Sequence, residues 1–344
     1  MIIIIVISIF LVIFLIFGKK GYDYYQKIFA SNVTLKKDSI CFIYIPTGST
    51  LEDVVGIMDE GGILKDKDTF IWLARIKNYP NHIYPGKYTL SDRMNNNELI
   101  TLLRSGSQTP VQVVFNYTRT KEQFALKISR QIEADSIDVL SIINNESFLT
   151  ECGYNPETVI SVFIPNTYEL YWNTSAEQFF ERMLSEYKRF WTEDRKARAE
   201  EMDLGQLGVS ILASIIDEET TKNDEKPKIA GVYMNRFKMG MPLQACPTIK
   251  YAMDDWSLTR ILDKHLVVES RYNTYINKGL PPGPITFPSV AGIEAVLNYE
   301  KHNYLFFAAK DDFSGYHYFS KILAQHNIYS ARYQEALEEQ RNKQ

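Results

Sequence analysis

The sequence predicts an α+β protein with an apolar N-terminal helix, a small strand–helix–helix–strand subdomain and a larger mixed α+β domain. A chain of 344 residues has room for two or three domains, at roughly 150 residues each. Short apolar runs between turn residues alternate with segments of helical periodicity, which indicates mixed secondary structure. The content of 45% hydrophobic and 23% charged residues is that of a globular protein with a sizeable core. A net charge of −4 without a long basic run gives no sign of nucleic-acid binding.

The N-terminal segment Ile2–Phe17 is almost uniformly apolar. Its length lies at the short end of the range for a membrane-spanning helix. Because it has neither a basic n-region nor a small-residue cleavage site, we expect a retained transmembrane anchor at residues 1–18 rather than a signal peptide. Residues 19–37 are polar without periodicity and are expected to form a tether. Lys19 and Lys20 follow the apolar segment, so the positive-inside rule weakly favours a cytoplasmic location for the rest of the chain.

Residues 38–107 are expected to form a compact subdomain with the order strand, helix, helix, strand and a further helix. This order resembles a LysM-type carbohydrate-binding module, although many small α+β units share it. The expected elements are a strand at Cys41–Pro46, helices at Leu51–Glu60 and Asp66–Lys77, a strand at Gly86–Leu90 and a helix at Met94–Ser105.

Residues 108–204 are expected to lead from this subdomain into the largest domain. Proline, asparagine and aromatic residues in FIPNTYELYW predict an irregular loop before a long amphipathic helix. The expected elements are a strand at Val111–Asn116, a helix from Thr118 or Thr120 to Ile132, a helix at Asp135–Asn144, the loop at 163–172 and the helix from Ser175 to about Lys196.

Residues 205–344 carry a helix with the sequence LASIIDEET and two long loops rich in proline, glycine and asparagine. Ordered loops of this length are often functional. The expected elements are helices around 208–222, at Lys226–Phe237 and at Ile293–Asn298, loops at 240–253 and 270–288, paired strands at 304–310 and 315–321, and a charged helix at Ile328–Lys343.

The first of these helices contains the strongest catalytic candidate. Leu212, Ile215, Ile216 and Glu219 follow one another at i, i+3, i+4 and i+7, so they share one helical face. The apolar stripe that should face the core therefore ends in a carboxylate. A carboxyl group withdrawn from water has a raised pKa, as a general acid working near neutral pH requires. Glu219 is the predicted acid.

Two further acids, Asp217 and Glu218, precede Glu219 in the sequence. Three consecutive acids more commonly mark a solvated helix end than a catalytic group, and perturbed carboxylates also occur in structural networks. If Glu219 were not the acid, Glu218 and Asp217 would be the next candidates.

The remaining residues with chemical potential are polar groups in the long loops and near the C-terminal strands. The cysteines, at positions 41, 152 and 246, are widely spaced and form no metal motif or disulfide framework. No nucleotide-binding or nucleophile-elbow motif is present, and we expect no metal ion or cofactor. The polar candidates are Gln244, Asn273, Tyr275, His317 and His326.

Blocks spread over nearly the whole chain resemble the endolytic murein transglycosylases of the MltG/YceG-like family. They occur in the family's order and include the N-terminal anchor. The other blocks are HIYPGKYTL (82–90), FIPNTYELY (163–171), ASIIDEET (213–220), GVYMNRFKMGMPLQACPTIKYAM (231–253), YNTYINKGLPPGPITFP (272–288) and YLFFAAKDDFSGYHYFSKILAQHN (304–327).

The resemblance implies a role for individual residues. The family's catalytic glutamate falls on Glu219, the residue that the helical face selects independently. Asp217 stands where the family has another glutamate, a conservative change. Asn166 and Cys246 stand where the family has aspartates, so any substrate-positioning role of those aspartates is weakened or moved in this chain.

The family's reaction cleaves the β-1,4 bond between N-acetylmuramic acid and N-acetylglucosamine within a glycan strand, without water. The C6 hydroxyl of the muramic acid attacks its own anomeric carbon, which leaves a 1,6-anhydro end. One glutamate protonates the leaving oxygen and then accepts the hydroxyl proton, whereas most glycosidases need two carboxyl groups. The residues expected to bind substrate are Gln244, Asn273, Tyr275, Asn166 and His317.

The resemblance further implies a fold with a LysM-like subdomain at 38–107 and a YceG-like catalytic core at 205–344. It implies a single-pass protein of the bacterial cytoplasmic membrane with its catalytic part on the outer side, against the orientation that the two lysines favour. The substrate would be nascent peptidoglycan close to the synthesis machinery, where cleavage terminates glycan elongation. Two alternatives remain open, a catalytically silent murein-binding scaffold and a muramidase that uses water.

Overall fold

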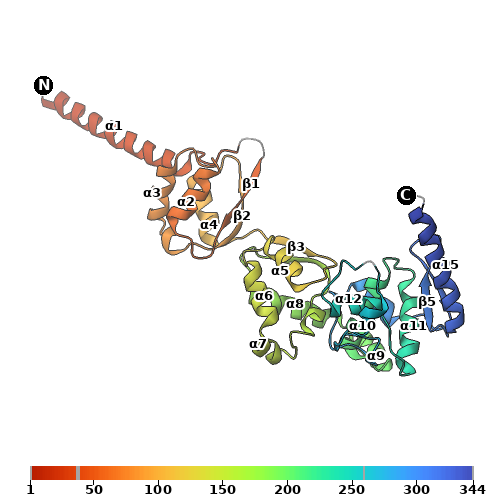
Figure 1. Ribbon diagram of the computed structural model, residues 1–344. Helices are drawn as coiled ribbons and strands as arrows, with labels where there is room; N and C mark the ends of the chain where they lie inside the picture. The colour runs from red at the N-terminus through yellow and green to blue at the C-terminus, as the bar shows by residue number, and fades with distance from the viewer. Residues whose placement is uncertain (1, 36–38, 259, 343–344) are drawn as a thin grey trace. The chain divides into compact units, whose positions relative to one another are not determined.

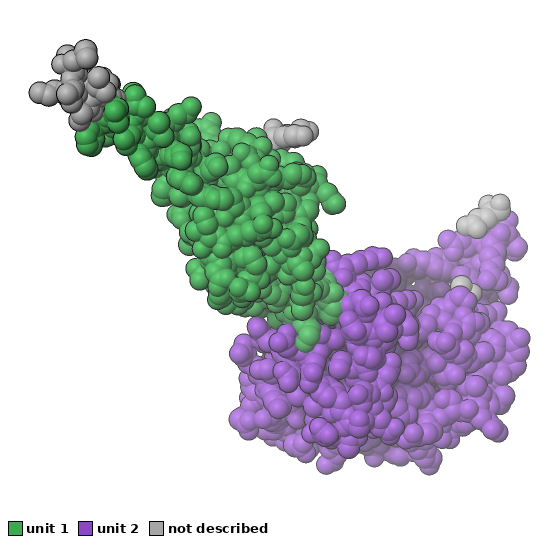
Figure 2. All heavy atoms as spheres, turned by 90° about the vertical axis from the view of Figure 1, so that its left-hand side faces the viewer, with its two compact units in different colours: residues 1–113, 131–134, 168–175 green, residues 114–130, 135–167, 176–344 purple. Residues whose placement is uncertain are grey.

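The computed structural model describes residues 2–35, 39–258 and 260–342 and has a mixed α+β architecture (Figure 1). The predicted α+β class is confirmed. Each of the sheets in the described residues has two strands, in the pairs β1–β2, β3–β4 and β5–β6. The chain divides into two compact units (Figure 2): unit 1 contains residues 1–113, 131–134 and 168–175, and unit 2 contains the remainder.

Unit 1 begins with helix α1 (Ile2–Phe29), which continues well into the segment for which the sequence predicted a tether. Packing within unit 1 explains the difference. The Tyr24 ring stacks on Trp72 at 5.5 Å between centroids, and the Asn96 side chain donates a hydrogen bond of 2.9 Å to the carbonyl of Lys27. The side chains of residues 9–17 are exposed.

Within residues 2–35, 39–258 and 260–342, no helix is both long enough and apolar enough to cross a membrane. The transmembrane character predicted for residues 1–18 is therefore not confirmed.

The rest of unit 1 has the order that the sequence predicts, strand, helix, helix, strand, helix. Strands β1 and β2 pair antiparallel, with Ile40 opposite Ser91 and Ile45 opposite Gly86. Side-chain caps set the helix starts, as where Thr50 and Asp53 form a capping box. The elements are β1 (Ile40–Ile45), α2 (Leu51–Glu60), α3 (Lys67–Ile76), η1 (Tyr79–Asn81), β2 (Gly86–Ser91) and α4 (Asn96–Ser105).

Between residues 111 and 201 the structure differs from expectation in two places. Part of the predicted loop forms strand β4, which pairs with β3. The predicted long helix is broken in two, because the Thr192 hydroxyl accepts from the Arg195 backbone N–H and starts a new helix after the buried Trp191. The elements are β3 (Val111–Phe115), α5 (Lys121–Ser129), α6 (Ser136–Asn144), α7 (Glu146–Glu151), η2 (Val159–Val162), β4 (Asn166–Leu170), α8 (Ala176–Phe190) and α9 (Glu193–Glu201).

Helix α10 (Gly205–Glu219) is the central element of unit 2. It is buried on all sides from Gly208 to Ile216, not only along the predicted stripe. Ser214 is buried without cost because its hydroxyl donates to Ile211 and accepts from the Ile285 backbone N–H at 3.0 Å. The acids therefore emerge where α10 leaves the core.

Helices and a small sheet surround the end of α10. Strands β5 and β6 pair antiparallel, as predicted, with Ala309 opposite His317. The last helix packs along these strands and begins at Leu323, five residues earlier than expected. The elements are α11 (Lys226–Lys238), α12 (Cys246–Ala252), α13 (Asp263–Leu266), α14 (Val290–Leu297), β5 (Phe306–Ala309), β6 (His317–Ser320) and α15 (Leu323–Asn342).

Candidate active site

The three consecutive acids at the end of α10 lie in three different environments. Asp217 is structural. Its Oδ1 accepts from Lys226 Nζ and from Ser289 Oγ, each at 2.7 Å, and its Oδ2 accepts from the Ser289 backbone N–H at 2.7 Å. Gly292 is required beside it, since a Cβ at that position would lie 2.7 Å from Oδ1. Asp217 thus joins α10 to the starts of α11 and α14.

Glu218 points toward a basic and aromatic group on another side of the helix. Its Oε2 lies 3.2 Å from Arg119 Nη2, and the Arg119 guanidinium lies over the Trp256 ring at 5.0 Å. Burial raises the pKa of Glu218 to about 7, and the charge of Lys250 opposes this shift. Glu218 does not line the cavity that contains its neighbour.

Glu219 lies in a cavity of about 440 Å³, which we call the Glu219 cavity. Its Oε1 accepts a hydrogen bond of 2.6 Å from the Tyr233 hydroxyl. Burial raises the pKa of Glu219, while the Tyr233 hydrogen bond and the charges of His317, Lys250 and Arg236 oppose the rise. The direction agrees with that expected from the helical face, and it is the direction that a general acid requires.

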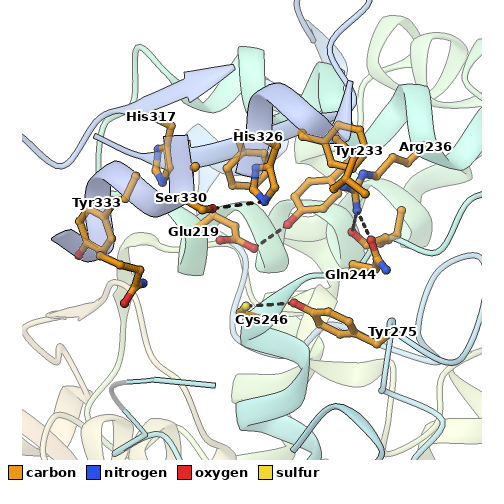
Figure 3. Close-up of a pocket in the computed structure, with 17 residues that line it drawn as sticks. Glu219, Tyr233, Arg236, Gln244, Cys246, Tyr275, His317, His326, Ser330 and Tyr333 are labelled. Atoms are coloured by element: carbon orange, nitrogen blue, oxygen red, sulfur yellow. Dashed lines mark hydrogen bonds between the residues drawn. The ribbon is translucent and has the colours of Figure 1, made fainter. Parts of the chain in front are cut away.

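The walls of the Glu219 cavity come from segments far apart in the sequence (Figure 3). In the close-up, Glu219 lies between side chains of α15 on one side and the Cys246–Tyr275 pair on the other. Besides Glu219, the polar and aromatic lining consists of Tyr233, Arg236, Gln244, Cys246, Tyr275, Phe306, Phe307, His317, His326, Ser330, Tyr333 and Gln334.

Of the five predicted substrate-binding residues, Gln244, Tyr275 and His317 line this cavity. Gln244 adopts a left-handed backbone conformation with φ of 54°. Its backbone N–H donates to Thr274 at 3.0 Å, and its side-chain oxygen accepts from Arg236 at 3.2 Å. A backbone conformation of this kind persists only where the surroundings enforce it.

Asn273 and Asn166 are not brought into the cavity lining. Asn273 is fully buried, and its amide donates to the carbonyls of Leu266 and Val268 at 2.9 and 2.8 Å. It therefore holds the loop that presents Tyr275. Asn166 is exposed at the start of β4, where its side-chain oxygen accepts from the Thr167 backbone N–H. The polarity of a loop alone could not distinguish these structural roles from substrate binding, because turns also use polar side chains for hydrogen bonds to their own backbone.

Several cavity residues were not singled out by the sequence pattern. Tyr233 and Arg236 lie within the helix predicted at Lys226–Phe237, for which the sequence predicted no functional residue. Arg236 holds the cavity wall, since its Nε donates to the Leu305 carbonyl at 2.6 Å and its Nη1 to the Leu243 carbonyl at 2.8 Å. Cys246, already noted in the sequence as standing where the family has an aspartate, also lines the cavity. It lies 3.2 Å from the Tyr275 hydroxyl, and burial together with the charge of Glu219 raises the pKa of its thiol.

The chain belongs to the YceG-like family, whose sequence profile matches residues 43–332. It is similar to the endolytic murein transglycosylase of Bacillus subtilis (strain 168), with 30% identity over 307 residues, covering 85% of this chain and 84% of the relative. The endolytic murein transglycosylase of Streptococcus pneumoniae serotype 2 is 26% identical over 334 residues, and the match covers 87% of this chain and 60% of that protein. A crystal structure of a YceG-like protein from Listeria monocytogenes has a TM-score of 0.55 and 29% identity, covering 84% of this chain and 98% of its own.

Proposed function

We propose that this protein is an endolytic lytic transglycosylase of peptidoglycan, with Glu219 as its general acid. The observation that carries the proposal is the state of that carboxyl group. Burial keeps its pKa raised, and a single tyrosine hydroxyl holds it at the wall of a cavity. The names of the relatives from Bacillus subtilis and Streptococcus pneumoniae support the substrate and the reaction class.

The single carboxylate among the described residues that line the cavity supports a reaction without water. Glycosidases that use water place two carboxyl groups roughly 5–10 Å apart, one as acid and one as base or nucleophile. Among the described lining residues of the Glu219 cavity, Glu219 is the only carboxylate. Of the acids close to it in the sequence, Asp217, Glu218 and Glu225 have the basic partners Lys226, Arg119 and His317, respectively, and Asp224 accepts from the Tyr316 hydroxyl.

In the simplest scheme, protonated Glu219 donates its proton to the glycosidic oxygen as the bond to the anomeric carbon of N-acetylmuramic acid breaks. The C6 hydroxyl of the same sugar attacks that carbon, and the Glu219 carboxylate accepts the hydroxyl proton. The substrate thus supplies the nucleophile. Gln244 and Tyr275, which line the cavity, bind hydroxyl or acetamido groups of the substrate in this scheme.

The test is a digest of purified murein by the full-length chain, with wild type beside Glu219→Gln and the adjacent Glu218→Gln as matched control. We expect 1,6-anhydro-ended fragments by mass spectrometry from wild type and from Glu218→Gln, and none from Glu219→Gln. Fragments heavier by one water would identify a muramidase instead. Murein binding without any fragments would identify a silent scaffold, and anhydro fragments from Glu219→Gln would place the acid elsewhere.

Two finer features belong to the same proposal. The exposed apolar side chains of residues 9–17 attach the protein to the bacterial cytoplasmic membrane, with unit 2 on the outer side near the synthesis machinery. Unit 1 acts as a LysM-like glycan-holding or spacing module, which its βααβ order supports. Flotation with liposomes should retain the full chain and lose a variant without residues 2–17, and isolated glycan strands provide the binding test for unit 1.

A further inference from the structure

Two hydrogen bonds to a buried carboxylate fix the orientation of His317 in the Glu219 cavity. His317, at the start of β6, gives two hydrogen bonds to one carboxylate. Its backbone N–H donates to Glu225 Oε1 at 2.8 Å, and its ring Nδ1 lies 2.6 Å from Glu225 Oε2. Both side chains are nearly withdrawn from solvent, with 12% of His317 and 6% of Glu225 exposed. The Phe307 ring packs edge-on against the imidazole, with centroids 5.3 Å apart.

The hydrogen bonds to Glu225 determine which nitrogen of the His317 imidazole carries the proton. An ionised carboxylate can only accept hydrogen bonds, so the proton of neutral His317 lies on Nδ1 and Nε2 carries a free lone pair. Nε2 makes no hydrogen bond to any residue in 2–35, 39–258 or 260–342. It is also not fully buried. Since His317 lines the same cavity as Glu219, this nitrogen is open to a ligand there (Figure 3).

The other basic groups of the cavity are less suited to accept a proton. The guanidinium of Arg236 remains charged in proteins, and backbone carbonyls already occupy it. His326 lies on α15 against the Phe306 ring, and the only hydrogen-bond partner of its imidazole among the described residues is the Ser330 hydroxyl, 3.5 Å from Nε2. The Tyr233 hydroxyl is bound to Glu219. His317 alone combines a carboxylate partner with a free ring nitrogen.

We propose that His317 is the base of the reaction, with Glu225 as the residue that positions it and Glu219 as the acid. This inference rests on the proposed function and divides the two proton transfers between two side chains. The C1–O4 bond breaks with its electron pair going to O4, which takes the Glu219 proton. The O6–H bond breaks as O6 bonds to C1, and the O6 proton goes to His317 Nε2. Transfer of that proton from His317 to the Glu219 carboxylate restores both groups, and no water is consumed.

The charges around His317 are compatible with this cycle. Glu225 contacts it from the N-cap of α11, and Glu219 of α10, Arg236 of α11 and His326 of α15 line the same cavity. When His317 is protonated, its charge favours the ionised form of Glu219. The acid and the base therefore reach their charged states together, after which one proton transfer neutralises both.

The test compares murein cleavage by the full-length wild type with three variants. His317→Gln should lower kcat by about 10²–10⁴-fold, the usual contribution of general base catalysis, with KM changed only a few-fold. Glu225→Gln should lower kcat by about 10–10², because the ring loses its charged positioning partner. Asp224→Asn is the matched control, since Asp224 accepts from the hydroxyl of Tyr316, the residue before β6, at 3.0 Å and makes no hydrogen bond to His317 within the described residues, and it should retain wild-type kcat.

Two readouts separate a base from a structural histidine. If Glu219 must be protonated and His317 unprotonated, the pH profile of wild-type kcat is bell-shaped, and the acidic limb disappears in His317→Gln. A single-glutamate mechanism gives only the basic limb. Added imidazole should restore cleavage by His317→Ala, since the small molecule can replace the lost ring.

Each result decides the question. Wild type that cleaves to anhydro ends while His317→Gln stays within about 3-fold in kcat refutes the base and leaves the proposed function standing. Persistence of the acidic limb in His317→Gln, or equal losses in Asp224→Asn and Glu225→Gln, also refutes it. Wild type without anhydro products refutes the proposed function, and the role of His317 falls with it.

Discussion

Asp217→Asn should destabilise unit 2 without removing the catalytic acid. Its side chain is 2% exposed and that of Lys226 is 7% exposed, with 2.7 Å between Oδ1 and Nζ. Removing one partner of a buried ion pair leaves an uncompensated charge and costs about 3–5 kcal/mol. Asparagine also presents an N–H group where the Ser289 backbone N–H now donates at 2.7 Å. For a domain of this size, the loss corresponds to a fall in Tm of roughly 6–20 °C.

The assay is thermal and denaturant unfolding of wild type, Asp217→Asn, Lys226→Met and the double variant. Asp217→Asn leaves the buried charge of Lys226 without a partner, and Lys226→Met removes that charge. The double variant should therefore lose about 2 kcal/mol less unfolding free energy than the sum of the single losses. Below its Tm, Asp217→Asn should still cleave murein. A Tm within about 2 °C of wild type for Asp217→Asn, or additive losses in the double variant, would refute the assignment of Asp217 as a buried structural partner.

Two further predictions concern the other acids of α10. Tyr233→Phe removes the hydroxyl that stabilises ionised Glu219, so the pKa of Glu219 should rise and the basic limb of the pH–activity profile should move to higher pH, whereas a shift to lower pH would contradict the geometry. Glu218 has its pKa raised from 4.5 to about 7, so its contribution to stability is present below about pH 4.5 and is lost as pH rises through 7. In Glu218→Gln, the decline in unfolding free energy between pH 5 and 8 should therefore be smaller by up to about 3 kcal/mol. The ion pair of ionised Glu218 with Arg119 reduces this difference. Urea titrations at several pH values that show the same pH dependence as wild type would contradict the prediction.

Local sequence determined much of the secondary structure. The bounds of α2 agree with the predicted ones because a threonine cap and an apolar period act over a single turn or two. Strand β2 and the β5–β6 pair were also found from short apolar runs. The break between α8 and α9 escaped prediction, although the apolar stripe ends at Trp191 and Thr192 followed by two acids is a typical helix start.

Non-local packing explains the remaining differences in the fold. The second half of α1 has no periodic sequence pattern. It is helical because it packs against Trp72 and accepts a hydrogen bond from Asn96, both far along the chain. Strand β4 lies in a stretch whose proline and asparagine indicate a loop, and pairing with β3 makes it extended. Propensity is a weak prior, and tertiary contacts override it at such places.

The sequence by itself determined that an apolar helix ends in three acids, that one of them continues the buried face, and that the surrounding blocks resemble one family. Only the tertiary structure decided what each acid does. Asp217 is paired with Lys226, Glu218 with Arg119, and Glu219 alone faces the cavity beneath the Tyr233 hydroxyl. The physical reason is that the ionisation of a carboxyl group depends on the charges and water around it, and here those are set by partners 9, 99 and 14 residues away in the chain.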